Sequence, residues 1–282
     1  MTLRLKSPAK INLFLNVLKK RPDGYHEIET LFERISLSDE VILSPAKSGI
    51  HVESDSRGIP KGSRNIAHRA AKLLKDTFHV HEGVRITIRK KIPVSAGLGG
   101  GSSNAATVLL GLNKLWKLGL SKGELVKLGA RLGSDVPFFL LETPFCLARG
   151  RGEKLRKIKG PIRKIWHVVI KPSFGTSTKK AYSVLEASFL TPKKTDVKML
   201  LHSIHEGRSD ALSKLLTNSL ECAVYSTLKI KEKLLAQGAL GALMSGSGSA
   251  VFGVYKDRQT AFKAARVLRK NRAWKVFVAS TY

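Results

Sequence analysis

Hydrophobic and polar residues alternate along much of the first ninety positions, as they do in β-strands with one buried face. One stretch, from Ile66 to Phe78, instead has apolar residues at helical spacing, with Ser63 as the expected N-cap. Pro8 predicts a bend within the first strand. The predicted strands cover residues 3–18, 26–37, 40–45 and 84–93, with a turn at 21–24 (RPDG).

The remainder of the chain mixes helical and strand patterns. SGSG at 245–248 predicts a tight loop between two strands. Predicted helices cover 103–119, 121–133, 178–187, 195–203, 209–217, 225–236 and 257–269, and predicted strands cover 166–170, 239–244, 249–255 and 275–280. This mixture predicts an α+β protein, and a change of composition near Arg149 to Pro161 indicates a domain boundary.

The composition is typical of a globular protein of about two domains, since 43% of the 282 residues are hydrophobic and 25% are charged. No apolar run approaches the ~20 residues of a membrane span. Lys10, Asn12 and Asn16 interrupt the first apolar stretch, which argues against a secretory signal. Cys146 and Cys222 form no CxxC or zinc-like pattern. These features predict a cytoplasmic protein.

The formal net charge of +29 is unusual. Such a charge attracts polyanions, including nucleic acids, acidic membrane surfaces and phosphorylated small molecules. The densest basic stretch is Arg149 to Lys164, but Lys and Arg also occur in nearly every predicted element, and no aromatic residue is interleaved with that stretch. A generally basic surface therefore explains the charge as well as a nucleic-acid site does.

The strongest chemical signal is the stretch PVSAGLGGGSSN, residues 93–104, which we call the glycine loop. Its four glycines allow positive φ angles and close approach of a ligand to the backbone. Ser102, Ser103 and Asn104 are expected to cap the helix that follows. A strand, a glycine loop and a helix N-terminus together present N–H donors that suit a triphosphate, and the serine hydroxyls offer a contact to magnesium.

Three common kinds of glycine-rich segment match the glycine loop less well. A P-loop needs a lysine after the glycines, and none follows here. A dinucleotide site needs GxGxxG, but counting from Gly97 the third glycine position is Ser102. A flexible linker rarely separates a strong strand from a strong helix. The glycine loop is therefore interpreted as a phosphate site that follows neither the P-loop pattern nor the dinucleotide pattern.

Two further positions carry charged groups between apolar residues. Lys10 and Asn12 point to the same face of one predicted strand, so they can line a ligand site together, although a strand lysine is more often a solvent-facing charge. Asp135 is expected at a loop-to-strand junction because Pro137 favours an extended residue before it. An aspartate in such a place is as often a turn cap.

Five segments together resemble the GHMP kinases, a family named for galactokinase, homoserine, mevalonate and phosphomevalonate kinases. The segments are PAKINLFL at 8–15, RPDGYHEIETLF at 21–32, PVSAGLGGGSSNAATVL at 93–109, LGSDVPFF at 132–139 and MSGSGSAVF at 244–252. They cover almost the whole chain in the family's order. The first two resemble one branch, which phosphorylates the 2-hydroxyl group of a cytidine-diphosphate-linked methylerythritol in the non-mevalonate pathway to isoprenoids.

The resemblance implies a two-domain GHMP kinase fold of the α+β class with a cleft between the domains. The N-terminal ATP-binding domain, similar to a ribosomal-protein domain, is expected at residues 1–155, and the C-terminal α/β sandwich domain at 156–282. It also implies ATP with Mg²⁺, a small-molecule substrate, no dedicated nucleic-acid or membrane partner, and a monomer or homodimer.

In such kinases a lysine and an aspartate meet at the acceptor hydroxyl, and the matching residues here are Lys10 and Asp135. Asp135 would accept the hydroxyl proton, while Lys10 would offset charge on the transferred phosphoryl group. The residues implied for the substrate, with the second and third at cytosine, are Asn12, Tyr25, His26, Phe32, Thr178 and Tyr182. Those implied for the nucleotide are Asn65 and Ile66 near adenine, then Pro93, Val94, Ser95, Ala96, Gly97, Leu98, Gly99, Gly100, Gly101, Ser102, Ser103, Ser245, Gly246, Ser247 and Gly248.

One departure from the family lies at the start of the glycine loop, where relatives commonly have more glycine and this chain has Val94, Ser95 and Ala96. Two other functions stay open. A GHMP kinase for homoserine or a mevalonate-type alcohol would have no base to stack on Tyr25. An RNA-binding protein would use the positive charge but has no use for the glycine loop together with Asp135.

Overall fold

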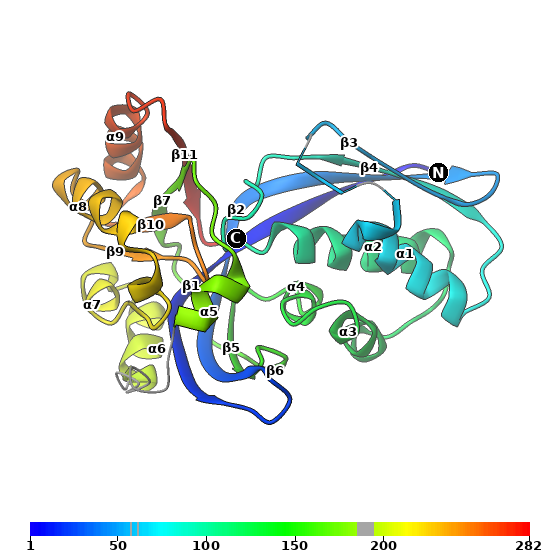
Figure 1. The fold of residues 1–282 in the computed structure, drawn as a ribbon, viewed down its shortest axis with the longest axis horizontal. Helices are drawn as coiled ribbons and strands as arrows, with labels where there is room; N and C mark the ends of the chain where they lie inside the picture. The colour runs from blue at the N-terminus through cyan, green and yellow to red at the C-terminus, as the bar shows by residue number, and fades with distance from the viewer. Residues whose placement is uncertain (57, 61, 185–194) are drawn as a thin grey trace. The chain divides into compact units, whose positions relative to one another are not determined.

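The structure is a computed structural model that describes residues 1–56, 58–60, 62–184 and 195–282 (Figure 1). These residues pack into two compact units. Both units are discontinuous in sequence, because the long strands β1 (Leu3–Lys20) and β2 (His26–Ala46) are each divided between them. Unit 1 contains Met1–Ala9, Ser38–Val94 and Gly99–Thr143, and unit 2 contains Lys10–Leu37, Ser95–Leu98 and Pro144–Tyr282. The domain boundary expected between residues 155 and 156 stays a prediction.

Unit 1 combines a mixed sheet with helices on one of its faces (Figure 1). The second half of β2 pairs antiparallel with β4, which pairs parallel with β3. Beyond its share of β1 and β2, unit 1 contains β3 (Ile50–Ser54), η1 (Gly62–Arg64), α1 (Ile66–Thr77), β4 (Gly83–Arg89), α2 (Gly100–Leu115), α3 (Lys122–Ala130) and α4 (Val136–Leu140). The helices predicted over 103–119 and 121–133 are confirmed in α2 and α3.

Two helix starts in unit 1 differ from the expected ones. The N-cap of α1 is Asn65 rather than Ser63, since the Asn65 side chain accepts a hydrogen bond from the Ala67 N–H group at 2.9 Å. α2 begins at Gly100, directly after Gly99 in the left-handed region at φ 67°. Ser102, Ser103 and Asn104 are therefore inside the first turns of α2, and the expectation that they cap it is wrong.

The expectation of a strand after Asp135 is wrong. Residues Val136–Leu140 form the short helix α4, and Asp135 occupies its N-cap position with φ −84° and ψ −15°. Pro137 lies in the first turn of α4, where a proline loses no hydrogen bond and its fixed φ suits the helix. This benefit outweighs the extended preference of the residue before a proline.

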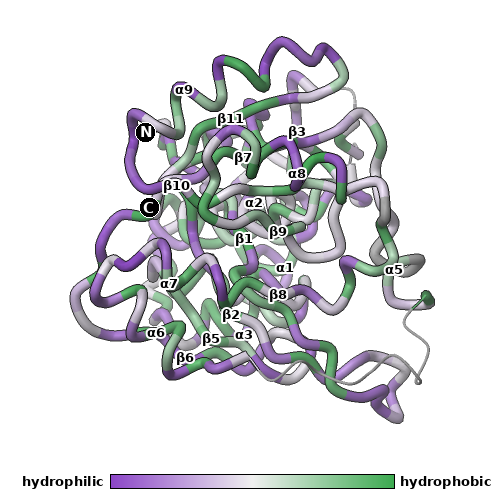
Figure 2. Tube along the Cα trace, turned by 90° about the vertical axis from the view of Figure 1, so that its left-hand side faces the viewer, coloured by the Kyte–Doolittle hydropathy of each residue, from purple (hydrophilic) through white to green (hydrophobic). Residues whose placement is uncertain are grey.

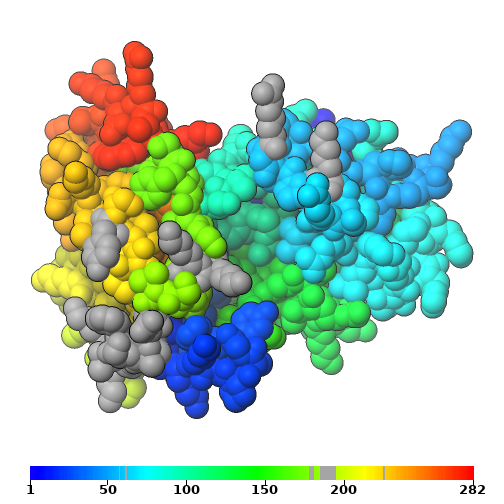
Figure 3. Space-filling model, in the orientation of Figure 1, coloured from blue at the N-terminus to red at the C-terminus, as the bar shows by residue number. Residues whose placement is uncertain are grey.

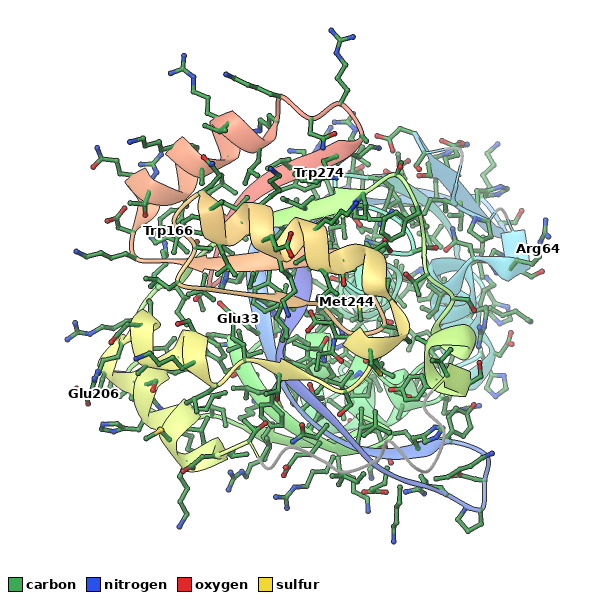
Figure 4. All side chains as sticks on the ribbon, turned by 60° about the vertical axis from the view of Figure 1, so that its left-hand side comes forward. Glu33, Arg64, Trp166, Glu206, Met244 and Trp274 are labelled. Atoms are coloured by element: carbon green, nitrogen blue, oxygen red, sulfur yellow. The ribbon has the colours of Figure 1, made fainter. Side chains whose placement is uncertain are left out.

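Unit 2 contains a four-stranded antiparallel sheet in the order β11-β7-β10-β9. Trp166 and Trp274 mark opposite ends of the β7–β11 pair (Figure 4), since Trp274 pairs with Pro172 and Ser280 with Trp166. The elements of unit 2 beyond β1 and β2 are β5 (Phe145–Gly150), β6 (Lys154–Lys157), β7 (Trp166–Pro172), α5 (Thr178–Val184), α6 (Val197–Glu206), α7 (Ser209–Lys214), β8 (Thr217–Asn218), η3 (Glu221–Ala223), η4 (Tyr225–Thr227), α8 (Leu228–Ala236), β9 (Gly241–Met244), β10 (Val251–Tyr255), α9 (Arg258–Leu268) and β11 (Trp274–Ser280). Residues 185–187 of the helix predicted over 178–187 lie outside the described residues.

Helices α8 and α9 cover this sheet with their apolar faces. Leu234 of α8 and Ala265 of α9 belong to the same buried cluster as Ile170 and Val251 of the sheet. The trace of α9 alternates between hydrophilic and hydrophobic residues in Figure 2, as expected of a helix with one face in the core.

The first half of β2 belongs to unit 2. There it pairs antiparallel with β5, and β5 pairs antiparallel with β6. Glu33 of β2 is fully buried (Figure 4). Its Oε1 accepts a hydrogen bond from Thr281 Oγ1 at 2.7 Å and lies 3.0 Å from His167 Nε2, which connects β2 with β7 and the C-terminal residues. Among the described helices none is long and apolar enough to cross a membrane.

Candidate active site

Within unit 2, β1 and β2 present the polar face that the alternation in β1 predicts. Lys10 Nζ donates a hydrogen bond to Asn12 Oδ1 at 2.7 Å and lies 5.0 Å from the centroid of the Phe32 ring. The side chains of Lys10 and Asn12 are only 4% and 2% exposed. Lys10 is therefore a buried, positioned cation, and the alternative of a solvent-facing strand charge is wrong.

Residues 95–98 of the glycine loop also belong to unit 2, and their carbonyl groups are held by it. The Ala96 carbonyl accepts from the Ala250 N–H group at 3.1 Å, and the Leu98 carbonyl accepts from the Lys10 N–H group at 3.0 Å. Between them, the Gly97 carbonyl accepts from Ser245 Oγ at 3.0 Å. Three successive carbonyl groups are thus fixed, which leaves the N–H groups of this segment as the donors it offers to an anion.

The loop Ser245–Gly248, the second glycine loop expected from sequence, packs directly against the first within unit 2. A Cβ atom at Gly97, whose φ is 74°, would lie 2.0 Å from the Ser245 carbonyl oxygen. A Cβ atom at Gly246 would lie 3.3 Å from Asn12 Oδ1 and 3.4 Å from Lys10 Nζ. Only glycine permits these approaches, so the structure brings both loops to the Lys10–Asn12 pair.

The turn between β1 and β2 carries the residues implied for cytosine and lies at the surface (Figure 3). Asp23 Oδ1 accepts from the Tyr25 N–H group at 3.2 Å, and Arg21 pairs with Glu27 at 2.6 Å, so the turn is held on both sides. Tyr25 is 55% exposed, and the guanidinium of Arg151 lies 4.9 Å from the centroid of its ring.

His26 stacks on Tyr182, with ring centroids 5.1 Å apart and an interplanar angle of 28°. We call Tyr25, His26 and Tyr182 the aromatic set. Burial, and secondarily the positive charge of Lys20, lowers the pKa of His26 below its usual 6.5. Its imidazole is thus neutral near pH 7, with one donor and one acceptor for hydrogen bonds. Thr178 begins α5, and its side chain lies outside the described part of the chain.

In unit 1, residues that the family resemblance implies for the nucleotide lie around Ile66. A Cβ atom at Gly101 would lie 3.6 Å from Ile66 Cγ2, and one at Gly133 would lie 3.9 Å from Ile66 Cδ1. Ile66 therefore packs between the first turn of α2 and the loop that leads to Asp135. The carboxylate of Asp135, which is half-buried, makes no capping hydrogen bond to α4.

The start of α2 provides the helix N-terminus that the glycine loop predicts. The first N–H groups of an α-helix have no partner within the helix, and they favour an anionic ligand. Asn65, implied near adenine, uses its amide to cap α1 and to donate to the Pro60 carbonyl at 2.9 Å. A contact between Asn65 and adenine stays a prediction.

A buried network around Asp39 was not anticipated from the sequence. Asp39 Oδ1 accepts from the N–H groups of Lys91 and Ile92, each at 2.8 Å. Its Oδ2 accepts from Asn104 Nδ2 at 2.9 Å and pairs with the Lys90 ammonium group. One carboxylate thereby holds the two residues before the glycine loop and the last residue of the loop.

The same network reaches the serines of the glycine loop. Ser7 Oγ accepts from Asn104 Nδ2 and donates to Ser103 Oγ, both at 2.8 Å. Ser103 is fully buried, whereas Ser102 is half-buried. The magnesium contact expected from the serine hydroxyls therefore fits Ser102 better. Among the described residues no group of three or more His, Cys, Asp and Glu could hold a metal.

Two family models match the chain, the GHMP kinases N terminal domain over residues 65–143 and the GHMP kinases C terminal over residues 196–273. The chain is 41% identical over 284 residues to a 4-diphosphocytidyl-2-C-methyl-D-erythritol kinase from Acetivibrio thermocellus, with 99% of each chain covered. It is 46% identical over 263 residues to the protein of that name from Geobacillus kaustophilus, with 90% of this chain and 88% of the relative covered.

Among solved structures, a crystal structure of a 4-(cytidine 5'-diphospho)-2C-methyl-D-erythritol kinase matches with a TM-score of 0.86 at 35% identity, covering 99% of this chain and 98% of the other. These matches confirm the resemblance read from the five segments and the GHMP kinase fold that it implied. The chain therefore belongs to the GHMP kinases and, within them, to the 4-diphosphocytidyl-2-C-methyl-D-erythritol kinase family.

Proposed function

We propose that this chain transfers the γ-phosphoryl group of ATP to the 2-hydroxyl group of 4-diphosphocytidyl-2-C-methyl-D-erythritol, as a step in the synthesis of isoprenoid precursors. The observation that carries the proposal is the aromatic set, in the unit that also holds Lys10. The exposed Tyr25 ring and the stacked rings of His26 and Tyr182 offer flat faces to a pyrimidine. The neutral imidazole of His26 offers hydrogen bonds to its edge.

In the proposed reaction Asp135 accepts the proton of the 2-hydroxyl group. The oxygen then forms a bond to the γ-phosphorus, and the bond from that phosphorus to the oxygen bridging it to the β-phosphorus breaks, releasing ADP. The buried Lys10 ammonium offsets the negative charge on the transferred group, and its bond to Asn12 holds it in place. Bound Mg²⁺ would neutralise charge on the phosphates, and the Ser102 hydroxyl would be its protein ligand.

The nucleotide phosphates are proposed to bind to the glycine loop. The fixed carbonyls of Ala96, Gly97 and Leu98 and the start of α2 at Gly100 support this, because both leave N–H donors for an anion. Cys146 and Cys222 are both free thiols, which supports the cytoplasmic location expected from the sequence.

A kinase for homoserine or a mevalonate-type alcohol is the nearest alternative, since it would share the glycine loop and Lys10. The test is a panel of alcohols in one ADP-release assay with ATP and Mg²⁺: the cytidine-linked alcohol, homoserine, mevalonate and no alcohol. ADP release that depends on the cytidine-linked alcohol, and that free CDP inhibits competitively against that alcohol, supports the proposal. Equal release with homoserine or mevalonate, or no release with any alcohol, contradicts it.

A further inference from the structure

Thr30 of β2 is fully buried and connects β2 to β1 through its hydroxyl group. Its Oγ1 donates a hydrogen bond to the Phe14 carbonyl oxygen and lies 2.8 Å from Asn12 Nδ2. On the other side of the amide, Asn12 Oδ1 lies 2.7 Å from Lys10 Nζ. Thr30, Asn12 and Lys10 thus form a continuous row of buried polar groups that ends at the ammonium group.

The direction of each hydrogen bond in this row follows from the chemistry of the groups. A carbonyl oxygen only accepts, so the single hydroxyl proton of Thr30 is used by Phe14. The Thr30 oxygen can then only accept from Asn12, which must present its NH₂ group to Thr30. The oxygen of the Asn12 amide is consequently turned to the Lys10 ammonium group, which only donates.

From this geometry, and resting on the proposed function, we propose that Thr30 is a positioning residue that fixes the Asn12 amide and through it the Lys10 ammonium group. If the amide turned over, two donors would face each other at Lys10 among buried side chains, which is unfavourable. An ammonium group has three N–H bonds at fixed angles. Holding one of them on Asn12 therefore sets the directions of the other two relative to the phosphoryl group.

The proposal is tested with Thr30→Val, which keeps the β-branched shape and removes the hydroxyl, and with Thr30→Ser, which keeps the hydroxyl. In the ADP-release assay Thr30→Val is expected to lower kcat about 100-fold, as small misplacements of reacting groups do, with little change in KM for ATP. Thr30→Ser is expected to restore kcat to within about threefold of wild type. Thr227→Val is the matched control, because Thr227 is also fully buried and donates to a carbonyl, that of Val224, at 2.7 Å. It is expected to lose similar stability without the loss of kcat.

A second experiment asks whether Thr30 acts through Asn12. In an Asn12→Ala background, Thr30→Val is expected to change kcat by less than about twofold, because the amide that it orients is gone. A purely structural role for Thr30 predicts the full effect in that background. Either that result or a wild-type kcat in Thr30→Val alone would overturn the proposal.

A readout that does not depend on turnover separates this proposal from the proposed function. In protein labelled with ¹⁵N at lysine, the Lys10 Nζ–H signal, assigned by its absence in Lys10→Met, is expected to be protected from exchange in wild type and Thr30→Ser and lost in Thr30→Val. If wild type releases no ADP with any alcohol while this pattern is observed, the proposed function fails and the positioning by Thr30 stands. An unchanged Lys10 signal in Thr30→Val overturns the positioning whatever the activity.

Discussion

The Asp39 carboxylate and the Lys90 ammonium group form a buried ion pair within unit 1, and both side chains are almost inaccessible to solvent. Asp39 does more than neutralise Lys90, because it also accepts hydrogen bonds at the two ends of the glycine loop, from Ile92 and from Asn104. A Cβ atom at Gly100 would lie 3.2 Å from Lys90 Nζ, so the pair lies directly under the start of α2. The shape of the loop therefore depends on a residue more than fifty positions earlier in the chain.

Asp39→Asn is expected to lower the free energy of unfolding by about 3–5 kcal/mol, because it leaves the buried Lys90 charge without its counter-ion. It is also expected to raise KM for ATP, since the loop ends lose an acceptor. Urea unfolding followed by tryptophan fluorescence, together with ATP titrations, measures both effects. Asp76→Asn is the control, as Asp76 pairs with Lys72 on the exposed face of α1 and should cost about 0.5 kcal/mol or less. Equal unfolding midpoints for the two variants would contradict this reasoning.

Asp135→Asn is expected to lower kcat by about 10²–10⁴-fold, the usual contribution of a general base. The dissociation constant for ATP should stay within about twofold of wild type, since the lost interaction is made only in the transition state. Single-turnover kinetics and calorimetric titration with ATP separate these effects. A turnover number equal to that of wild type would remove Asp135 from the proposed mechanism.

Local pattern was sufficient for much of the fold and for part of the site. The alternation that places Lys10 and Asn12 on one face of β1 is a property of neighbouring residues, and the hydrogen bond between the two side chains agrees with it. The glycine loop was also predictable, because a strand, several glycines and a helix follow one another directly. The strands β3, β5, β6 and β8 were missed. β3, β5 and β8 pair with strands that lie far away in sequence, and β6, which pairs with the nearby β5, has only four residues.

The contacts that hold the site in place carry no local signal. Asp39 stands alone between two extended segments, and nothing nearby in sequence indicates that its partners are Lys90 and Asn104. Thr30 fits the alternation of β2 as an ordinary strand residue, and only the cross-strand bond to Asn12 shows what its hydroxyl does. The strand expected after Asp135 was wrong because two preferences compete there. The extended preference of the residue before Pro137 is weaker than the preference of proline for the first turn of a helix.

The KM for the cytidine-linked alcohol is expected to depend on pH through His26. Because burial and Lys20 lower the pKa of His26 below 6.5, the ring should stay neutral, and KM constant, from about pH 8 down to 6.5. Below that range the ring gains a proton, loses its acceptor for the base edge, and KM should rise. The same shift means that the folded state binds a proton at His26 less readily than the unfolded state does. The contribution of the neutral His26 ring to the free energy of unfolding is therefore present above pH 6.5 and is lost as the pH falls below it. His26→Gln should give a higher KM without this pH dependence; an unchanged profile would assign the titration to another group.

Ser95→Gly tests the departure of the glycine loop from its relatives. Ser95 adopts φ 52°, in the left-handed region that favours glycine, so the serine carries backbone strain of about 1–2 kcal/mol. Glycine would relieve the strain but would lose about 0.5–1 kcal/mol more conformational entropy on folding. The free energy of unfolding is therefore expected to rise by about 1 kcal/mol or less, measured by urea unfolding. A clear loss of stability would show that the Ser95 side chain makes a contribution larger than its strain.

Gly97→Ala should disrupt the packing of the two glycine loops, and Gly238→Ala isolates the part of the effect that comes from backbone strain alone. Both glycines have positive φ, 74° and 83°, but a Cβ atom at Gly238 would meet nothing within 4 Å, whereas one at Gly97 would lie 2.0 Å from the Ser245 carbonyl oxygen. Gly238→Ala is expected to cost about 1–2 kcal/mol and to leave kcat/KM for ATP unchanged. Gly97→Ala adds an overpacking cost of about 1–3 kcal/mol and should lower kcat/KM steeply, because the displaced loops also contact the Lys10–Asn12 pair. Urea unfolding and ADP-release kinetics measure the two effects. If both variants lost equal stability and neither lost activity, the close contact at Ser245 would have no part in forming the site.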